Sequence, residues 1–203
     1  MDPVVDLSLR YVMRKLGTAA AALLVAGAGL VATAGTAGAA TGPVNKALSA
    51  EACSTAWGSG VKSATDSDVK PLRNITTSQS TCYDRMVFDV KGVSGKIGYH
   101  VGYVPKFYQD GSGEQIPVTG GAILQVFVSA PSYDPATTKP TYAGQAGKPL
   151  PGVKLTGYKT FRDTKFGASL EGQTQIGLGV RAKLPFRVQQ SGDKLIVDVA
   201  HTW

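Results

Sequence analysis

The segment RMVFDVKGVSGKIGYHVGYV, residues 85–104, carries the pattern on which the fold prediction rests. Apolar and polar side chains alternate through residues 85–90 and again through residues 97–104, and a short connection containing two glycines separates the two runs. Alternation with a period of two is typical of β-strands, and a glycine-bearing connection favours a hairpin. The segment therefore predicts two antiparallel strands joined to each other.

Further strand-like runs follow this segment at regular spacing. We expect strands at residues 122–129, 153–158, 174–180, 186–189 and 195–199, with a turn at residues 190–193. The polar stretch 63–70 and the Pro/Thr/Gly-rich stretch 131–151 indicate loops, the second long and on the surface. Several short strands without an amphipathic helical run predict an all-β fold, a two-layer antiparallel β-sandwich.

The N-terminal part has the features of an export signal. Arg14 and Lys15 precede an uncharged apolar run over residues 16–31, and small residues follow it. This is typical of a secretory signal peptide, here residues 1–39, with cleavage after Ala39. The remainder would be a flexible lead, residues 40–50, and a β domain, residues 51–203.

Two features leave alternatives open at this end. Asp2 and Asp6 do not suit a positive leader, so a true start at Met13 is the alternative. A retained membrane anchor is the less favoured alternative, because the run is short for a bilayer and rich in glycine and alanine. We expect a secreted protein without a stable membrane span, associated with the cell wall.

The chain contains two cysteines and two histidines. An exported protein meets oxidising surroundings, so we expect a disulfide between Cys53 and Cys82, with Trp57 packed near it. A redox pair is disfavoured because the spacing is not Cys-x-x-Cys. So few potential ligands predict no metal centre and no cofactor.

The formal net charge is +7, without a run of lysines or arginines. A nucleic-acid groove is therefore not expected. A positive protein outside the cell suits an anionic wall or membrane surface, although a solubilising surface explains the charge equally well.

No catalytic motif is present, so we expect a protein that is not an enzyme. Neither His100 nor His201 has a motif partner, and no serine lies in a nucleophile elbow. The alternative is a secreted hydrolase in which two of Asp84, Glu171 and Asp198 come together only in the fold. A third possibility is an extracellular inhibitor or partner-binding domain that uses the loop 131–151.

Two groups of residues are candidates for binding. In the run 176–180, Gly177 and Gly179 lie on one strand face and permit close approach by a ligand or by another part of the chain. Aromatic rings stack on sugars and arginines bind carboxylates, which suggests a saccharide or peptide platform, although the same residues suit core and rim positions. This second group comprises Tyr99, Tyr103, Phe107, Tyr108, Arg162 and Arg187.

The closing hairpin contains one charged residue on each strand, Arg187 and Asp198. A turn at residues 190–193 would place Arg187 opposite residues 194–196. We therefore expect separate partners for the two charges, with Asp198 held by Arg85 or by a backbone donor.

The string CYDRMVFDV, residues 82–90, resembles the opening strand of the AMIN-like domain family of secreted Gram-positive bacterial proteins. Other segments agree with it over nearly the whole chain beyond the leader, among them residues 98–104, 157–162, 171–174, 177–181, 184–188 and 195–203. The resemblance implies a β-sandwich related to AMIN domains, which target proteins to the cell envelope and are associated with peptidoglycan binding. It implies a non-catalytic envelope module that binds peptidoglycan, another cell-wall polymer or an envelope protein, and it supplies no catalytic residues.

Overall fold

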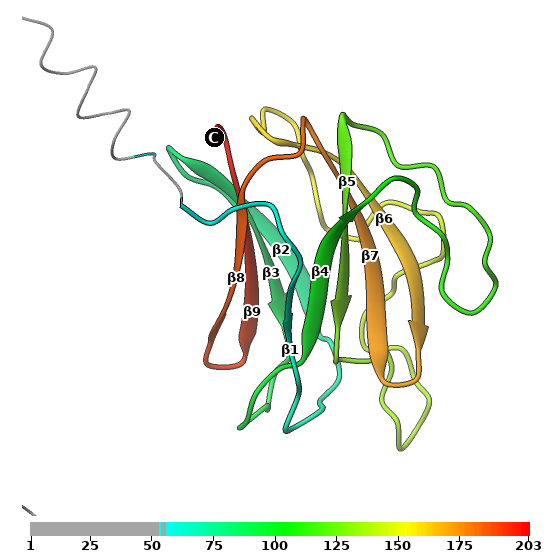
Figure 1. Ribbon diagram of the computed structural model, residues 1–203. Coiled ribbons are helices and arrows are strands. Elements are labelled where there is room, and N and C mark those ends of the chain that lie inside the picture. Colours follow the sequence, from blue (N-terminus) through cyan, green and yellow to red (C-terminus); the bar gives the residue numbers. More distant parts are fainter. Residues whose placement is uncertain (1–52, 54–55) are drawn as a thin grey trace, which may run out of the picture. The chain divides into compact units, whose positions relative to one another are not determined.

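The computed structural model describes Cys53 and residues 56–203, and these residues form strands, turns and loops without a helix (Figure 1). The predictions for the signal peptide, the start at Met13 and the lead at residues 40–50 lie outside the described residues. The strands are β1 (Lys62–Ala64), β2 (Asn74–Gln79), β3 (Tyr83–Asp89), β4 (Tyr99–Val104), β5 (Ala122–Val128), β6 (Phe161–Leu170), β7 (Gln173–Val180), β8 (Phe186–Ser191) and β9 (Lys194–Ala200).

The strands form two antiparallel sheets, which confirms the predicted all-β sandwich. The five-stranded sheet has the order β1-β4-β5-β7-β6, and the four-stranded sheet has the order β2-β3-β9-β8 (Figure 1). Strands β3 and β9 pair directly, although they come from opposite ends of the domain sequence. The pairing of β3 with β9 therefore joins the β2–β3 hairpin to the β8–β9 hairpin in one sheet.

The inner faces of the two sheets form one hydrophobic core. Alternate residues of β3, Met86 and Phe88, are fully buried, as the period-two pattern predicts. The core cluster also includes residues from the inner faces of the other central strands: Leu124, Val126, Ile176, Leu178, Val197 and Val199.

The predicted hairpin over residues 85–104 is wrong. Strands β3 and β4 lie in different sheets, so the connection between them crosses from one layer to the other. Its ends bond to the β8–β9 hairpin, because Val90 N–H donates to the Asp193 carbonyl and Ile97 N–H donates to the side chain of Gln190. Stacked sheets lie about 10 Å apart, a distance that a connection of this length spans.

Three other strand predictions need correction. Residues 153–158 form no strand, and their apolar side chains Val153 and Leu155 pack on the core from a loop. Strand β6 was missed because its charged residues hide the alternation, and its pairing with β7 is broken by two register shifts. Strand β1 lies partly in the stretch 63–70 that was predicted to be a loop.

The loop 131–151 contains no strand, as predicted, and it covers the edge strand β6. Gly147 N–H donates to the Phe166 carbonyl at 2.9 Å, and Phe166 N–H donates to the Lys148 carbonyl at the same distance. These bonds satisfy backbone groups of β6 that an uncovered sheet edge would leave unpaired.

The predicted disulfide between Cys53 and Cys82 is confirmed. The Trp57 ring lies 5.8 Å from the ring of Tyr83, the residue after Cys82, so Trp57 lies near the bridge as expected. Within the part of the chain that the structure describes, no helix is long and apolar enough to cross a membrane.

Candidate functional site

A row of polar side chains crosses the outer face of the four-stranded sheet. The strand register places Arg85 of β3 opposite Asp198 of β9, and it places Arg187 of β8 opposite Asp198 from the other side. Directly opposite residues in antiparallel strands point to the same face, so the three side chains meet. They lie on the face opposite the core, because Met86 and Phe88 point inward.

Asp198 fixes both arginines in this row. Arg85 Nε donates to Asp198 Oδ1 at 2.6 Å and Arg85 Nη2 donates to Oδ2 at 2.9 Å, which makes a bidentate pair. Arg187 Nε donates to Oδ2 at 2.8 Å. The Asp198 side chain is fully buried, whereas those of Arg85 and Arg187 are 27% and 33% exposed. Hydrogen bonding to Asp198 raises the pKa of the Arg85 guanidinium above its usual value.

The expectation of separate partners for Arg187 and Asp198 is therefore wrong, while the prediction that Arg85 holds Asp198 is confirmed. The closing turn is shorter than predicted, because Ser191 pairs with Lys194 and the turn contains only Gly192 and Asp193. Its centre lies further along the chain than the centre of residues 190–193. That shift moves Asp198 into the position opposite Arg187.

Two aromatic rings complete the group. The guanidinium carbon of Arg187 lies 4.3 Å from the centroid of the Trp57 ring and 5.2 Å from that of Tyr83. Arg85 lies 5.1 Å from the Tyr83 centroid and donates from Nη2 to the Tyr83 hydroxyl at 3.2 Å. We call the group Arg85, Arg187, Asp198, Trp57 and Tyr83 the arginine cluster.

The arginine cluster combines a surplus of positive charge with unused donors. Two guanidinium groups face one carboxylate, so the ion pairs leave one positive charge. Among the described residues, nothing accepts a hydrogen bond from Nη1 or Nη2 of Arg187 or from Nη1 of Arg85. Guanidinium N–H groups bind carboxylate and phosphate oxygens, and aromatic rings beside them offer a stacking surface. The arrangement therefore suits an anionic ligand.

Of the candidates predicted from the sequence, Arg187 alone lies in this cluster. Tyr99 and Tyr103 point to the inner face of β4, opposite Val128 and Leu124. Arg162 donates to backbone carbonyls of the turn before β6, and exposed Tyr108 closes the loop after β4 through a bridge to Gln115. The structure thus spreads the predicted platform over several regions.

The glycine face of β7 is covered by the protein's own chain. A Cβ atom on Gly177 would lie 2.8 Å from the ring of Phe107, which is fully buried there. A Cβ atom on Gly179 would lie 1.9 Å from the Thr119 carbonyl oxygen. Both contacts come from the connection between β4 and β5, so the close approach that the sequence indicated is made within the molecule.

The three acids of the alternative hydrolase do not share a cleft. Asp84 points between the sheets and is fully buried, whereas Asp198 lies on the outer face of the four-stranded sheet. Glu171 lies in the turn between β6 and β7, where its backbone has a φ of 49°. No two of these carboxylates therefore form the facing pair that glycoside cleavage needs.

Asp84 instead joins three segments of the fold, a role that the sequence did not indicate. Its Oδ2 accepts hydrogen bonds from the N–H groups of Thr160 at 2.6 Å and Phe161 at 2.9 Å. Its Oδ1 lies 2.9 Å from His201 Nε2, and His201 Nδ1 lies 3.0 Å from the Thr81 carbonyl oxygen. The His201 ring therefore bridges the Asp84 carboxylate and the backbone that precedes β3.

Tyr103 supports the loop that precedes β8. Its hydroxyl donates to the Leu184 carbonyl at 2.8 Å and accepts from Leu184 N–H at 3.0 Å. We expect Tyr103→Phe to lower the free energy of unfolding at neutral pH by about 1–2 kcal/mol, because the buried Leu184 backbone groups lose their partner. Urea unfolding measures this change. Tyr108→Phe, which alters an exposed ring, should leave the stability unchanged.

The buried Tyr103 hydroxyl should also make the stability of the protein depend on pH. Burial raises the pKa of Tyr103 from 10.0 to about 12. The pKa of Tyr103 is higher in the folded protein than in the unfolded chain. The stabilisation that the protonated Tyr103 hydroxyl gives the folded state is therefore complete below pH 10, and it is lost as the pH rises toward about 12. Stability should therefore fall more gently over this range in Tyr103→Phe than in the wild type. Equal slopes would contradict the assignment.

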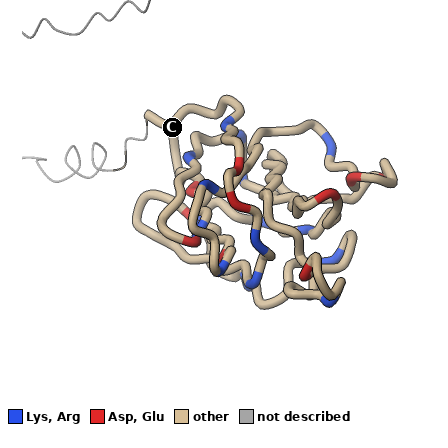
Figure 2. Tube along the Cα trace, turned by 90° about the horizontal axis from the view of Figure 1, so that it is seen from below, with Lys and Arg blue, Asp and Glu red and all other residues tan. Residues whose placement is uncertain are grey.

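Comparison with known proteins adds one finding. A family model, that of the AMIN-like domain, matches residues 70–201. No curated protein and no solved structure matches the chain. The matched residues contain four strands of the arginine cluster's sheet, and Trp57 lies before them. Figure 2 shows lysine and arginine positions interspersed with acidic ones along the fold.

Proposed function

Because the chain belongs to the AMIN-like domain family, we propose that it is a secreted, non-catalytic module of the cell envelope that binds peptidoglycan or another anionic wall polymer. The observation that supports binding is the arginine cluster on the outer face of the four-stranded sheet. The Cys53–Cys82 bond fits an extracellular protein, since disulfides persist in oxidising compartments.

The chemistry of the cluster suits the ends and branches of wall polymers. Peptide stems carry carboxylates, and other wall polymers carry phosphates. Both groups accept paired N–H donors from a guanidinium. Asp198 holds Arg187 by Nε alone, so the far edge of that guanidinium keeps two amino groups for a ligand.

The cluster is ordered before a ligand binds. Asp198 fixes the two guanidinium groups from the sheet side, and Trp57 lies over Arg187. A side chain that is already fixed loses little conformational freedom on binding, which favours affinity. Trp57 and Tyr83 add rings on which a neighbouring sugar can stack.

The test is cosedimentation of the purified protein with peptidoglycan at low salt. We expect the wild type to pellet, and we expect Arg187→Ala to weaken binding about tenfold or more, because it removes the free guanidinium edge. Arg187→Lys keeps the charge without the paired donors and should bind with intermediate strength.

The matched control is Arg73→Ala, which also removes one positive charge but alters an exposed residue directly before β2. It should bind nearly as well as the wild type. Wild-type protein that stays in the supernatant would refute wall binding. If Arg73→Ala and Arg187→Ala weakened binding equally, binding would depend on net charge and not on the arginine cluster.

A further inference from the structure

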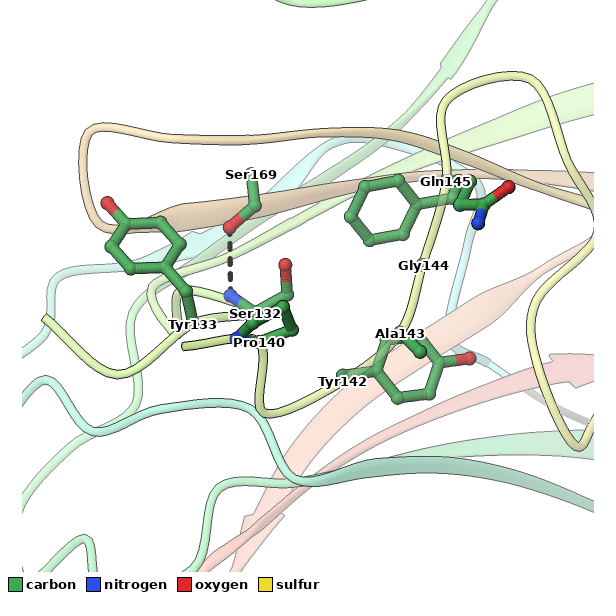
Figure 3. Close-up of a pocket in the computed structure, with 9 residues that line it drawn as sticks. Ser132, Tyr133, Pro140, Tyr142, Ala143, Gly144, Gln145 and Ser169 are labelled. Atoms are coloured by element: carbon green, nitrogen blue, oxygen red, sulfur yellow. Dashed lines mark hydrogen bonds between the residues drawn. The ribbon is translucent and has the colours of Figure 1, made fainter. Parts of the chain in front are cut away.

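A concave site lies between the loop 131–151 and strand β6, away from the arginine cluster's sheet. Its volume is about 420 Å³, and nine residues line it. Figure 3 shows Tyr133 at one end, Tyr142 and Gln145 at the other, and Ser132 with Pro140 between them. A cavity of this size lies in the range that holds small organic ligands.

Hydrogen bonds within the protein hold the walls of this pocket in place. Ser132 N–H donates to Ser169 Oγ of β6 at 2.8 Å, a bond visible in Figure 3. The Ser132 carbonyl accepts from Thr141 N–H at 2.8 Å, and the Tyr142 hydroxyl donates to the Pro151 carbonyl at 3.1 Å. The pocket is therefore formed before a ligand arrives, which removes the cost of ordering a loop.

One side of the pocket is apolar and tightly packed. The rings of Tyr142 and Phe166 lie 6.5 Å apart, and both residues are largely buried. A Cβ atom on Gly144 would lie 2.1 Å from the Phe166 ring, so only glycine fits at this position. The wall can therefore contact the apolar face of a ligand.

The other side of the pocket carries polar groups that make no hydrogen bond within the described residues. In the described part of the chain, the hydroxyls of Ser132 and Tyr133 and the side-chain amide of Gln145 have no hydrogen-bond partner. The nine lining residues include no acidic, basic or histidine side chain. A charged ligand would lose its hydration without gaining a counter-charge, and a wholly apolar ligand would leave these polar groups unpaired.

A ligand that matches the pocket is neutral, carries several hydroxyl or amide groups and has one apolar face. A pyranose ring has these properties, since its axial C–H groups stack on aromatic rings while its hydroxyls donate and accept hydrogen bonds. We propose that this pocket binds a neutral sugar ring of an oligosaccharide. The inference does not depend on the arginine cluster or on the anionic ligand proposed for it.

The test is a titration of the purified ¹⁵N-labelled protein, followed by amide chemical shifts. The probes are two neutral oligosaccharides, cellotetraose and the β-1,4-linked tetramer of N-acetylglucosamine, and a blocked tetraproline peptide. We expect at least one sugar to give saturable shifts in residues 132–145 and at Ser169, with a dissociation constant on the order of 1 mM.

Variants assign the shifts to the pocket. Tyr133→Ala should weaken sugar binding about tenfold, because it removes a half-buried ring that lines the pocket and can stack on the sugar. Tyr133→Phe keeps that ring and should bind more tightly than Tyr133→Ala. Tyr108→Ala removes an exposed tyrosine elsewhere and should bind as the wild type does.

Three results would overturn the proposal. These are no saturable shift with either sugar up to about 10 mM, tighter binding of tetraproline than of both sugars, and unchanged sugar binding in Tyr133→Ala. Arg187→Ala should bind the sugar normally. Its behaviour in cosedimentation therefore reports on the proposed polymer site alone, so that either proposal can fail without the other.

Discussion

Replacing Asp84 with alanine is expected to lower the free energy of unfolding by about 4 kcal/mol, enough to reduce the melting temperature by about 10 °C. The carboxylate is fully buried and accepts hydrogen bonds from the N–H groups of Thr160 and Phe161. It also pairs with the His201 ring. Alanine would leave two backbone donors and an imidazole without their acceptor inside the fold. Calorimetry or urea unfolding measures the effect.

Two further variants separate this explanation from a general loss of negative charge. Asp84→Asn keeps the shape and one acceptor oxygen, so it should destabilise the protein less than Asp84→Ala does. Glu114→Ala removes an exposed carboxylate from the loop after β4 and should leave the melting temperature unchanged. A stable Asp84→Ala protein would show that the link between β3 and the start of β6 is dispensable.

Asp198→Ala is expected to cost about 3 kcal/mol. Asp198 accepts three hydrogen bonds from Arg85 and Arg187, and its loss leaves two like charges side by side. The effect falls at the lower end of the range for buried ion pairs, because both arginines remain about one third exposed and keep contact with water. Chemical unfolding at low salt measures it.

A double variant tests the origin of this loss. Removing Arg187 together with Asp198 relieves the repulsion with Arg85, so the double variant should be less destabilised than the sum of the single ones. The surface pair Asp193–Lys194 in the same hairpin provides the control, and Asp193→Asn should change the stability little. Additive effects in the double variant would argue against coupling through Asp198.

The sequence predicted the sandwich but not how its strands are connected. The pattern in residues 85–90 correctly predicted a strand, and the side chains of β3 alternate between buried and half-buried positions. The same pattern could not show that β3 pairs with β9 rather than β4, since alternation describes the faces of a strand and carries no information about its neighbour. Strand β6 was missed because an edge strand covered by a loop tolerates charged residues on its length.

The candidate site could not be predicted for the same reason, because its residues meet only through strand pairings that the sequence pattern does not show. Arg187 and Asp198 were both identified from the sequence, but their contact follows from a turn of two residues where four were expected. Trp57 was expected near the disulfide, and its position over Arg187 follows from the fold around that bridge. The polar pocket beside β6 involves residues from a loop and a strand that were not predicted to meet.

The place of β9 in the centre of the four-stranded sheet has a consequence for the order of events during synthesis. Strand β3 can pair with β2 early, but it cannot pair with β9 until the Lys194–Ala200 segment has been synthesised. Such non-local pairing makes folding slow and late. Until that pairing forms, one edge of β3 keeps unpaired backbone groups, and such an edge favours association with other strands.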